Sequence, residues 1–126
     1  MEIFDLSGKV AMVTGSTKGL GESSAKALAK AGADVAVCGR NTEDLKRVSE
    51  AIKALGKDSE GFAFDVTKKK SVQEGVDRIL ERFGKIDILM NNAGLNHREP
   101  VLDYPEEAWD LVISTNLKGY FLVAQA

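Results

Sequence analysis

Three glycines, Gly15, Gly19 and Gly21, are spaced so that a phosphate could lie against the main chain where a strand gives way to a helix. They follow an apolar run at residues 10–13 and coincide with the start of a helical pattern near Leu20. Glycine permits φ > 0 and close approach of a phosphate, and the N–H groups and positive dipole end of a helix bind the anion. The pattern predicts a dinucleotide-phosphate site or, alternatively, a tight turn without a ligand.

The rest of this loop supplies polar groups, and we expect the whole loop to contact the cofactor. Its residues are Thr14, Gly15, Ser16, Thr17, Lys18, Gly19, Leu20 and Gly21. The hydroxyls of Thr14 and Ser16 either donate to phosphate or close the turn. The spacing Gly-x-x-x-Gly-x-Gly lacks the Lys-Ser/Thr pair of ATPase phosphate loops, which argues against that class of nucleotide site.

A second glycine motif, Asn91-Asn92-Ala93-Gly94, follows another apolar run near Leu89. With the first motif it resembles the short-chain dehydrogenase/reductase family, over a stretch from Leu6 to the last residue. The resemblance implies hydride transfer between a nicotinamide and a carbonyl or alcohol substrate. It also implies that Asn92, Ala93 and Gly94 leave space for ribose and nicotinamide, and that Asn amides tie neighbouring strands together.

The family's catalytic signature, Tyr-x-x-x-Lys preceded by Ser, normally lies beyond the point where this chain stops. Tyr104 and Tyr120 instead have Ala108 and Ala124 four positions later. We therefore expect the cofactor-binding half of an enzyme, inactive by itself. The alternatives are an inert nucleotide-binding module and an assembly fragment.

Asn116 is the residue to which the resemblance assigns a catalytic role. In the family an Asn in this helix organises a water that leads to the catalytic Lys. Asparagine has poor helix propensity and competes for backbone hydrogen bonds, so a helix kink without chemistry is the alternative.

Arg40 follows the apolar run at residues 35–39, where the adenosine ribose lies in dinucleotide-binding folds. An acidic residue there would bind the ribose hydroxyls of NAD, whereas a guanidinium can hold a 2′-phosphate. Lys18 adds a second positive charge, and Asn41 lies beside Arg40. These residues predict NADP(H), preferred over NAD(H), unless Arg40 is a solvated loop residue.

The resemblance places Asp65 at the adenine edge and Val66 over the adenine ring. As an alternative, Asp65 complements the N-terminal dipole of the following helix. His97 and Arg98 come soon after the second glycine motif, and this loop faintly resembles sugar-acid dehydrogenases of the family.

Four apolar runs, centred near Met12, Ala36, Ala63 and Leu89, are each followed by a helical pattern. This alternation of strand and helix patterns predicts an α/β fold in which continuous apolar strands form a parallel sheet with helices on both faces. We expect a doubly wound, Rossmann-like sheet of strand order 3-2-1-4, truncated before the remaining strands. Residues 1–126 then form a single dinucleotide-binding domain that is incomplete at its C-terminus.

The predicted helices have apolar faces and recognisable ends. The apolar faces comprise Leu45, Val48, Ile52 and Leu55 in one helix and Val72, Val76, Ile79, Leu80 and Phe83 in the next. Asn41 and Thr67 are predicted N-caps, and Gly32, Gly56 and Gly84 are predicted C-terminal glycines.

The last helix is predicted to begin near Glu106, after Pro105, and to become apolar on all sides from Leu117 onward. Such a helix must be covered, so we expect a homo-oligomer. The residues expected between chains are Tyr120, Phe121 and Val123, with the 88–90 strand edge covered by a partner or a rearranged segment.

Composition excludes several other functions. The 17 basic and 19 acidic residues give a net charge of −2, so no nucleic-acid partner is expected. No apolar run is long enough for a bilayer, and no leader pattern is present, so we expect a cytoplasmic protein without a membrane partner. Cys38 and His97 are the only residues of their types, so no His/Cys metal cluster is expected.

Overall fold

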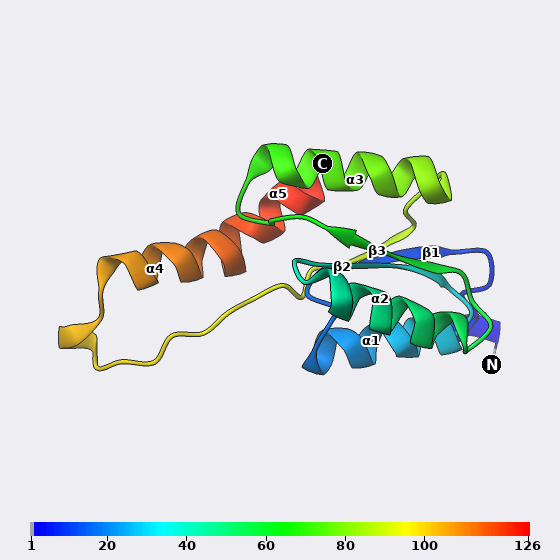
Figure 1. Cartoon of the computed structure of the whole chain (residues 1–126), viewed down its shortest axis with the longest axis horizontal. Coiled ribbons are helices and arrows are strands. Elements are labelled where there is room, and N and C mark those ends of the chain that lie inside the picture. Colours follow the sequence, from blue (N-terminus) through cyan, green and yellow to red (C-terminus); the bar gives the residue numbers. More distant parts are fainter. Residues whose placement is uncertain (1) are drawn as a thin grey trace.

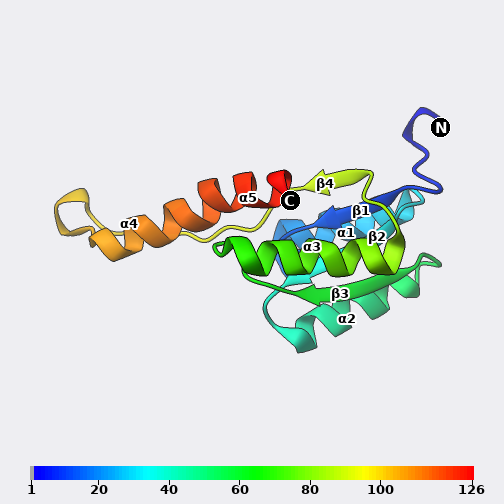
Figure 2. The same cartoon turned by 90° about the horizontal axis from the view of Figure 1, so that it is seen from above.

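The computed structural model describes residues 2–126 and contains a four-stranded parallel sheet in the order β3-β2-β1-β4. The strands are β1 (Val10–Val13), β2 (Asp34–Gly39), β3 (Ser59–Ala63) and β4 (Ile88–Met90). Figure 2 shows them side by side in this order. The predicted α/β class and strand order are confirmed.

Helices cover both faces of the sheet (Figure 1). Helices α1 (Gly19–Lys30) and α2 (Thr42–Lys53) lie on one face, and α3 (Lys69–Phe83) and α5 (Gly119–Gln125) lie on the other. Alternate residues of the central strands serve the two cores. Val13, Val35 and Val37 pack with α1 and α2, and Met12, Ala36 and Cys38 pack with α3 and α5. This double burial explains the continuous apolar sequences of β1 and β2.

The outer strands do not follow the predicted continuous apolar pattern. In β3, Ser59 and Phe62 are buried whereas Glu60 is exposed. In β4, Leu89 is 37% exposed. Both strands lie at sheet edges, where one side or face remains open, so the prediction of strands buried on both faces is wrong for them.

Most predicted helix ends are confirmed. The Asn41 Oδ1 atom accepts from the N–H groups of Glu43 and Asp44 at 3.0 and 3.1 Å, which caps α2. Gly84 ends α3 in the left-handed conformation with φ = 82°. Thr67 is a wrong prediction: Lys68 occupies the N-cap position of α3, because the Thr67 hydroxyl donates to the Asp65 carboxylate at 2.6 Å.

Two leucines predicted to be on buried helix faces are largely exposed. Leu55 lies beyond the last residue of α2 and is 42% exposed, and Leu80 is 41% exposed. Leu80 follows the fully buried Ile79, and one residue turns the side chain by about 100° around the helix. The buried face of α3 thus contains fewer residues than the apolar pattern in the sequence predicted.

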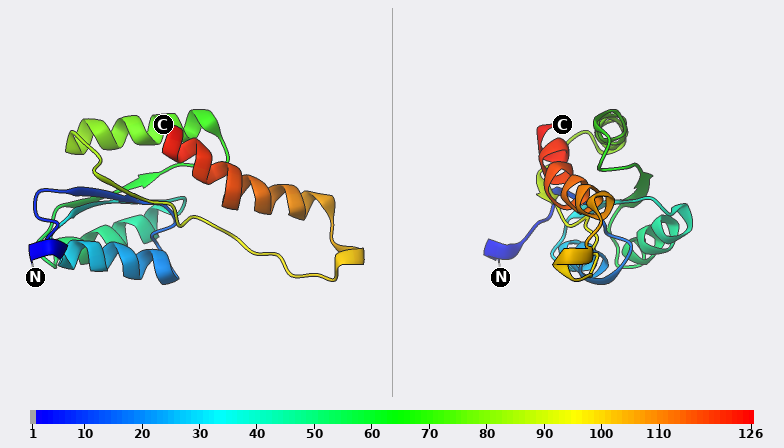
Figure 3. Two further views of the ribbon diagram at one scale, coloured as in Figure 1. Left: turned by 180° about the vertical axis from the view of Figure 1, so that it is seen from behind. Right: turned by 90° about the vertical axis from the view of Figure 1, so that its left-hand side faces the viewer.

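The last three helical segments of the chain form a rod, whose N-terminal part extends away from the sheet (Figures 1 and 3). The rod consists of α4 (Glu106–Ile113), a π-helical segment η3 (Ser114–Lys118) and α5, and a loop containing the short η2 (Val101–Asp103) leads into it. A further 3-10 turn, η1 (Glu2–Phe4), lies near the N-terminus. The helix start after Pro105 is confirmed.

The prediction that Val123 is buried between chains is wrong. Val123 is 4% exposed within its own chain, because α5 packs against α3 and places this side chain in the core. Phe121 and Leu117 point elsewhere on the rod and are 60% and 66% exposed.

Candidate cofactor site

The glycines of the first motif adopt conformations and contacts that a side chain would disturb. Gly15 and Gly19 have φ values of 61° and 51°, in the left-handed region. A Cβ on Gly15 would lie 2.8 Å from the Cα of Ala93, and one on Gly21 would collide with the Gly15 carbonyl oxygen. The two glycine motifs are therefore packed directly against each other.

The hydroxyls of Thr14 and Ser16 hold the ends of the strands together. The Thr14 Oγ1 atom accepts from the N–H groups of Asn92 and Ala93 at 2.9 and 3.0 Å. The Ser16 hydroxyl donates to the Val13 carbonyl at 2.8 Å and accepts from the N–H of Cys38 at 2.9 Å. These contacts support the turn-closing alternative for both hydroxyls.

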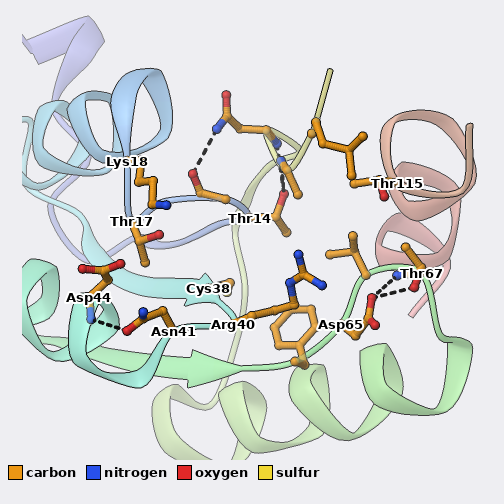
Figure 4. A pocket seen from close by; sticks show the side chains of 18 of the residues that line it. Thr14, Thr17, Lys18, Cys38, Arg40, Asn41, Asp44, Asp65, Thr67 and Thr115 are labelled. Atoms are coloured by element: carbon orange, nitrogen blue, oxygen red, sulfur yellow. Dashed lines mark hydrogen bonds between the residues drawn. The ribbon is translucent and has the colours of Figure 1, made fainter. Parts of the chain in front are cut away.

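A cavity of about 550 Å³ lies at the carboxyl ends of the strands, where the predicted switch point between β1 and β4 falls. Figure 4 shows polar side chains from the loops after β1, β2 and β3 around it. The predicted site residues that line it are Thr14, Gly15, Thr17, Lys18, Arg40, Asn41, Asp65, Val66, Asn92, Ala93 and Gly94. The predicted residues outside its lining are Ser16, Gly19, Leu20, Gly21 and Asn116.

Two cationic side chains, Lys18 and Arg40, line the part of the cavity near β2. Both residues are exposed, and within residues 2–126 neither forms a side-chain hydrogen bond or an ion pair. Charged groups without a protein partner are available to an anionic ligand. The site can therefore present two positive charges to a phosphate.

Asp65 also lines the cavity, and Figure 4 shows its carboxylate on the side toward which the Arg40 side chain points. Its Oδ1 atom accepts from the N–H of Thr67 at 2.9 Å and from the Thr67 hydroxyl. The hydroxyl bond is the main cause that lowers the pKa of Asp65, and the charge of Arg40 contributes. The Asp65 N–H donates to the Ser71 hydroxyl in the first turn of α3 at 2.9 Å, so this residue also orders the start of the helix.

The side chains of the asparagines in the second motif were expected to tie neighbouring strands together, but they bond to a loop and to a helix. The Asn92 side chain donates to the Gly15 carbonyl at 3.2 Å, and the Asn91 side chain donates to the Tyr120 carbonyl in α5 at 3.2 Å. Asn116 in η3 exchanges two hydrogen bonds with the backbone of Leu95. At Asn116 the structure has a π-helical turn, a local distortion of the kind that the helix-kink alternative describes.

Several cavity residues were missed by the sequence analysis. They are Cys38, Gly39, Asp44, Phe64, Thr67, Leu95, Leu111 and Thr115. Those that neighbour a predicted residue could have been found by extending each motif. Leu111 could not, because only the path of the rod brings α4 to the cavity. Burial raises the pKa of the Cys38 thiol, which keeps this side chain neutral.

His97 and Arg98 do not line the cavity. The His97 ring packs edge-on against Tyr104 with 5.1 Å between centroids, and its Nε2 atom lies 3.7 Å from a Glu99 carboxylate oxygen. His97 therefore has a carboxylate neighbour that the sequence analysis did not identify.

Residues 2–126 contain no group of three or more His, Cys, Asp or Glu side chains placed to bind a metal ion. No helix in the same described range is both long and apolar enough to cross a membrane.

Comparison with known proteins identifies the family whose members this chain resembles. The model of the family described as short chain dehydrogenase matches residues 9–126. Gluconate 5-dehydrogenase from Gluconobacter oxydans is 42% identical over 125 residues, which cover 99% of this chain and 49% of that protein. The chain thus spans about half the length of this curated relative.

Solved structures show the same similarity. A short-chain type dehydrogenase/reductase from Mycobacterium marinum has a TM-score of 0.95 and 39% identity, covering 98% of this chain and 50% of that one. An NAD⁺-bound xylitol dehydrogenase has a TM-score of 0.92 and 35% identity, covering 96% of this chain and 47% of that one.

Proposed function

Because this chain belongs to the short-chain dehydrogenase family, we propose that it is the NADP(H)-binding segment of an oxidoreductase. The complete protein would transfer hydride between the nicotinamide and a carbonyl or alcohol substrate. The observation that carries the NADP(H) proposal is the pair of unpaired cations, Lys18 and Arg40, in the lining of one cavity at the strand ends.

The residues of the cavity fit a dinucleotide. The glycine turn and the N-terminus of α1 would hold the pyrophosphate, since neither Gly15 nor Gly21 has room for a Cβ. Asp65 and Val66 would contact the adenine, and residues 92–94 would border the nicotinamide half. When bound, the cofactor supplies or accepts the hydride, and this chain's residues bind and orient it.

The choice between NADP and NAD rests on the end of β2. A ribose-binding acid is absent from the Gly39-Arg40-Asn41 sequence, although Asp44 lines the cavity one helical turn later. Charge-assisted bonds from Arg40 and Lys18 to a 2′-phosphate contribute about 1.5–3 kcal/mol each before solvent screening reduces them. We therefore place NADP(H) ahead of NAD(H), even though a similar xylitol dehydrogenase is NAD⁺-bound.

Calorimetric titration of this chain with 2′,5′-ADP and 5′-AMP tests the proposal. We expect tighter binding of 2′,5′-ADP, and equal affinities would contradict the NADP(H) preference. No binding of either nucleotide would favour the alternative that the chain is an assembly fragment.

Catalysis is a separate matter. Neither tyrosine has a lysine four residues later, so we expect no oxidation or reduction of substrates by this chain alone. Gluconate and other sugar acids are the first substrates to test with a complete protein, given the similar gluconate 5-dehydrogenase.

Turnover by this chain that Tyr104→Phe or Tyr120→Phe abolished would overturn the expectation that the chain is inactive alone. Absence of turnover together with nucleotide binding would fit either the segment or an inert binding module. A reading frame that continues past Ala126 would decide between these two.

Two further parts of the proposal concern assembly and location. The exposed Leu117 and Phe121 support a homo-oligomer. The proposed location is the cytoplasm.

A further inference from the structure

Arg47 contacts the glycine loop although it does not line the cavity. It lies on α2, and its Nη2 atom donates to the Thr17 carbonyl oxygen at 2.9 Å. Both Nη atoms also donate to the Glu22 Oε1 atom, each at 3.2 Å. Glu22 lies in the first turn of α1 and is held in addition by Lys26 at 2.7 Å. One guanidinium therefore joins α2, the loop and α1.

The Thr17 side chain packs onto the end of β2. A Cβ built on Gly39 would lie 3.1 Å from the Thr17 methyl carbon, so the two residues are in close contact. Lys18 follows Thr17, and Arg40 follows Gly39. The position of Thr17 thus sets the separation of the backbone segments that carry the two cationic side chains.

The same bond orients the peptide between Thr17 and Lys18. The C=O and N–H of a trans peptide point in opposite directions, so a Thr17 carbonyl held by Arg47 directs the Lys18 N–H away from α2. Within residues 2–126 this N–H donates to no protein acceptor. It remains available to a ligand.

Arg47 also lies near an acid of the cavity wall. Its Nε atom is 3.8 Å from the Asp44 Oδ1 atom, and Asp44 lines the cavity. A carboxylate there would repel a phosphate, and the neighbouring guanidinium offsets that charge.

We propose that Arg47 is a positioning residue that sets the selectivity of this site for a 2′-phosphate by holding Thr17. The inference rests on the proposed NADP(H) binding. Arg47 acts through the Thr17 carbonyl on the gap between Lys18 and Arg40, and it does not itself line the cavity.

Three variants test this role. Arg47→Met keeps the aliphatic stem but removes the donors. Arg47→Lys keeps the charge with a single ammonium in place of the forked donors. Lys46→Met is the matched control, because it removes an exposed positive charge from the adjacent position of α2.

The measurements are the affinities for 2′,5′-ADP and 5′-AMP by calorimetry and the amide ¹⁵N chemical shift of Lys18 without ligand. We expect Arg47→Met to lower the ratio of the two affinities by about three- to tenfold, which lies within the range of indirect couplings. The amide ¹⁵N chemical shift of Lys18 should also change in Arg47→Met. The affinity ratio of Arg47→Lys should lie between those of Arg47→Met and the wild type. Lys46→Met should change neither the affinity ratio nor the chemical shift. A purely structural role would lower both affinities by the same factor.

If Arg47→Met leaves the affinity ratio unchanged, the inference is overturned. The proposed function still stands in that case, because it depends on the preference of the wild-type chain for 2′,5′-ADP. Absence of the wild-type preference overturns the proposed NADP(H) function, and the inference with it. A lowered ratio with an unmoved Lys18 shift also overturns it, because Arg47 would then act through charge alone.

Discussion

The side-chain amide of Asn116 and the backbone of Leu95 exchange two hydrogen bonds. The Asn116 Oδ1 atom accepts from the Leu95 N–H at 2.9 Å, and its Nδ2 atom donates to the Leu95 carbonyl at 2.8 Å. This pair joins the π-helical turn of the rod to the loop that follows β4. In the part of the chain that the structure describes, Asn116 therefore holds main chain in place and does not line the cavity.

Replacing Asn116 by alanine should destabilise the chain. Both Leu95 backbone groups are then left without their partner, and each unsatisfied buried group costs about 1–3 kcal/mol. Partial exposure of the pair places the expected loss near the lower end, about 1–2 kcal/mol. Urea unfolding measures it, with Lys118→Ala, an exposed change in the same turn, as the control. Equal stability of the two variants would contradict the role assigned to Asn116.

Replacing Gly21 by alanine should be more damaging than replacing Gly8. The Gly21 Cβ would collide with the Gly15 carbonyl, whereas the Gly8 position has nothing within 4 Å. Overpacking costs about 1–3 kcal/mol. Gly8 has φ = 79°, so Gly8→Ala carries only the backbone strain of about 1 kcal/mol. Thermal unfolding compares the two variants, and a smaller loss for Gly21→Ala would show that α1 can shift away from the loop.

Arg40→Asp should remove the preference for 2′,5′-ADP over 5′-AMP. The change replaces a cation that lines the cavity by an anion that repels the 2′-phosphate. We expect the affinity ratio to fall by at least about tenfold, allowing for screening at an exposed site. Arg98→Asp makes the same charge change outside the cavity lining and serves as the calorimetric control. A ratio that survives Arg40→Asp would remove Arg40 from the site.

Asp65 should contribute to stability at neutral pH and lose that contribution in acid. Its folded pKa lies below the ordinary value of 3.8, chiefly because of the Thr67 hydroxyl bond. The stabilisation is therefore present above about pH 4 and disappears as the pH falls through the folded pKa. Unfolding of wild type and Asp65→Asn should differ more at pH 7 than at pH 3. Asp110→Asn, at an exposed helix position, is the control, and a difference independent of pH would contradict this account.

Phe121→Asp should weaken self-association if the exposed side of the rod is an interface between copies of the chain. Phe121 is 60% exposed and Leu117 is 66% exposed, so both can be covered by a partner. Light scattering after size-exclusion chromatography should give wild type a mass at least twice that of one chain. Gln125→Asp adds a charge at another exposed position of α5 and is the control. A wild-type monomer at tens of micromolar would refute the interface.

The order of the strands and the outline of the site could be predicted from short-range patterns. Gly15 and Gly94 mark strand ends by their motifs, and apolar runs such as residues 10–13 mark buried strands. Parallel strands place their carboxyl ends at one edge, so motifs far apart in sequence are expected to meet there. The structure confirms this meeting, because the N–H groups of Asn92 and Ala93 donate to the Thr14 hydroxyl oxygen.

The tertiary structure decided which residues of these motifs face the cavity and which bond to the backbone of other segments. Ser16 and Asn116 have residue types suited to binding, but their polar atoms bond to the backbones of Cys38 and Leu95. Arg47 was not singled out, because its contact with Thr17 spans 30 positions of the chain. Sequence spacing along one element determines which residues share a face. The partners of a polar side chain depend on the distances between separate elements, and these distances exist only in the folded chain.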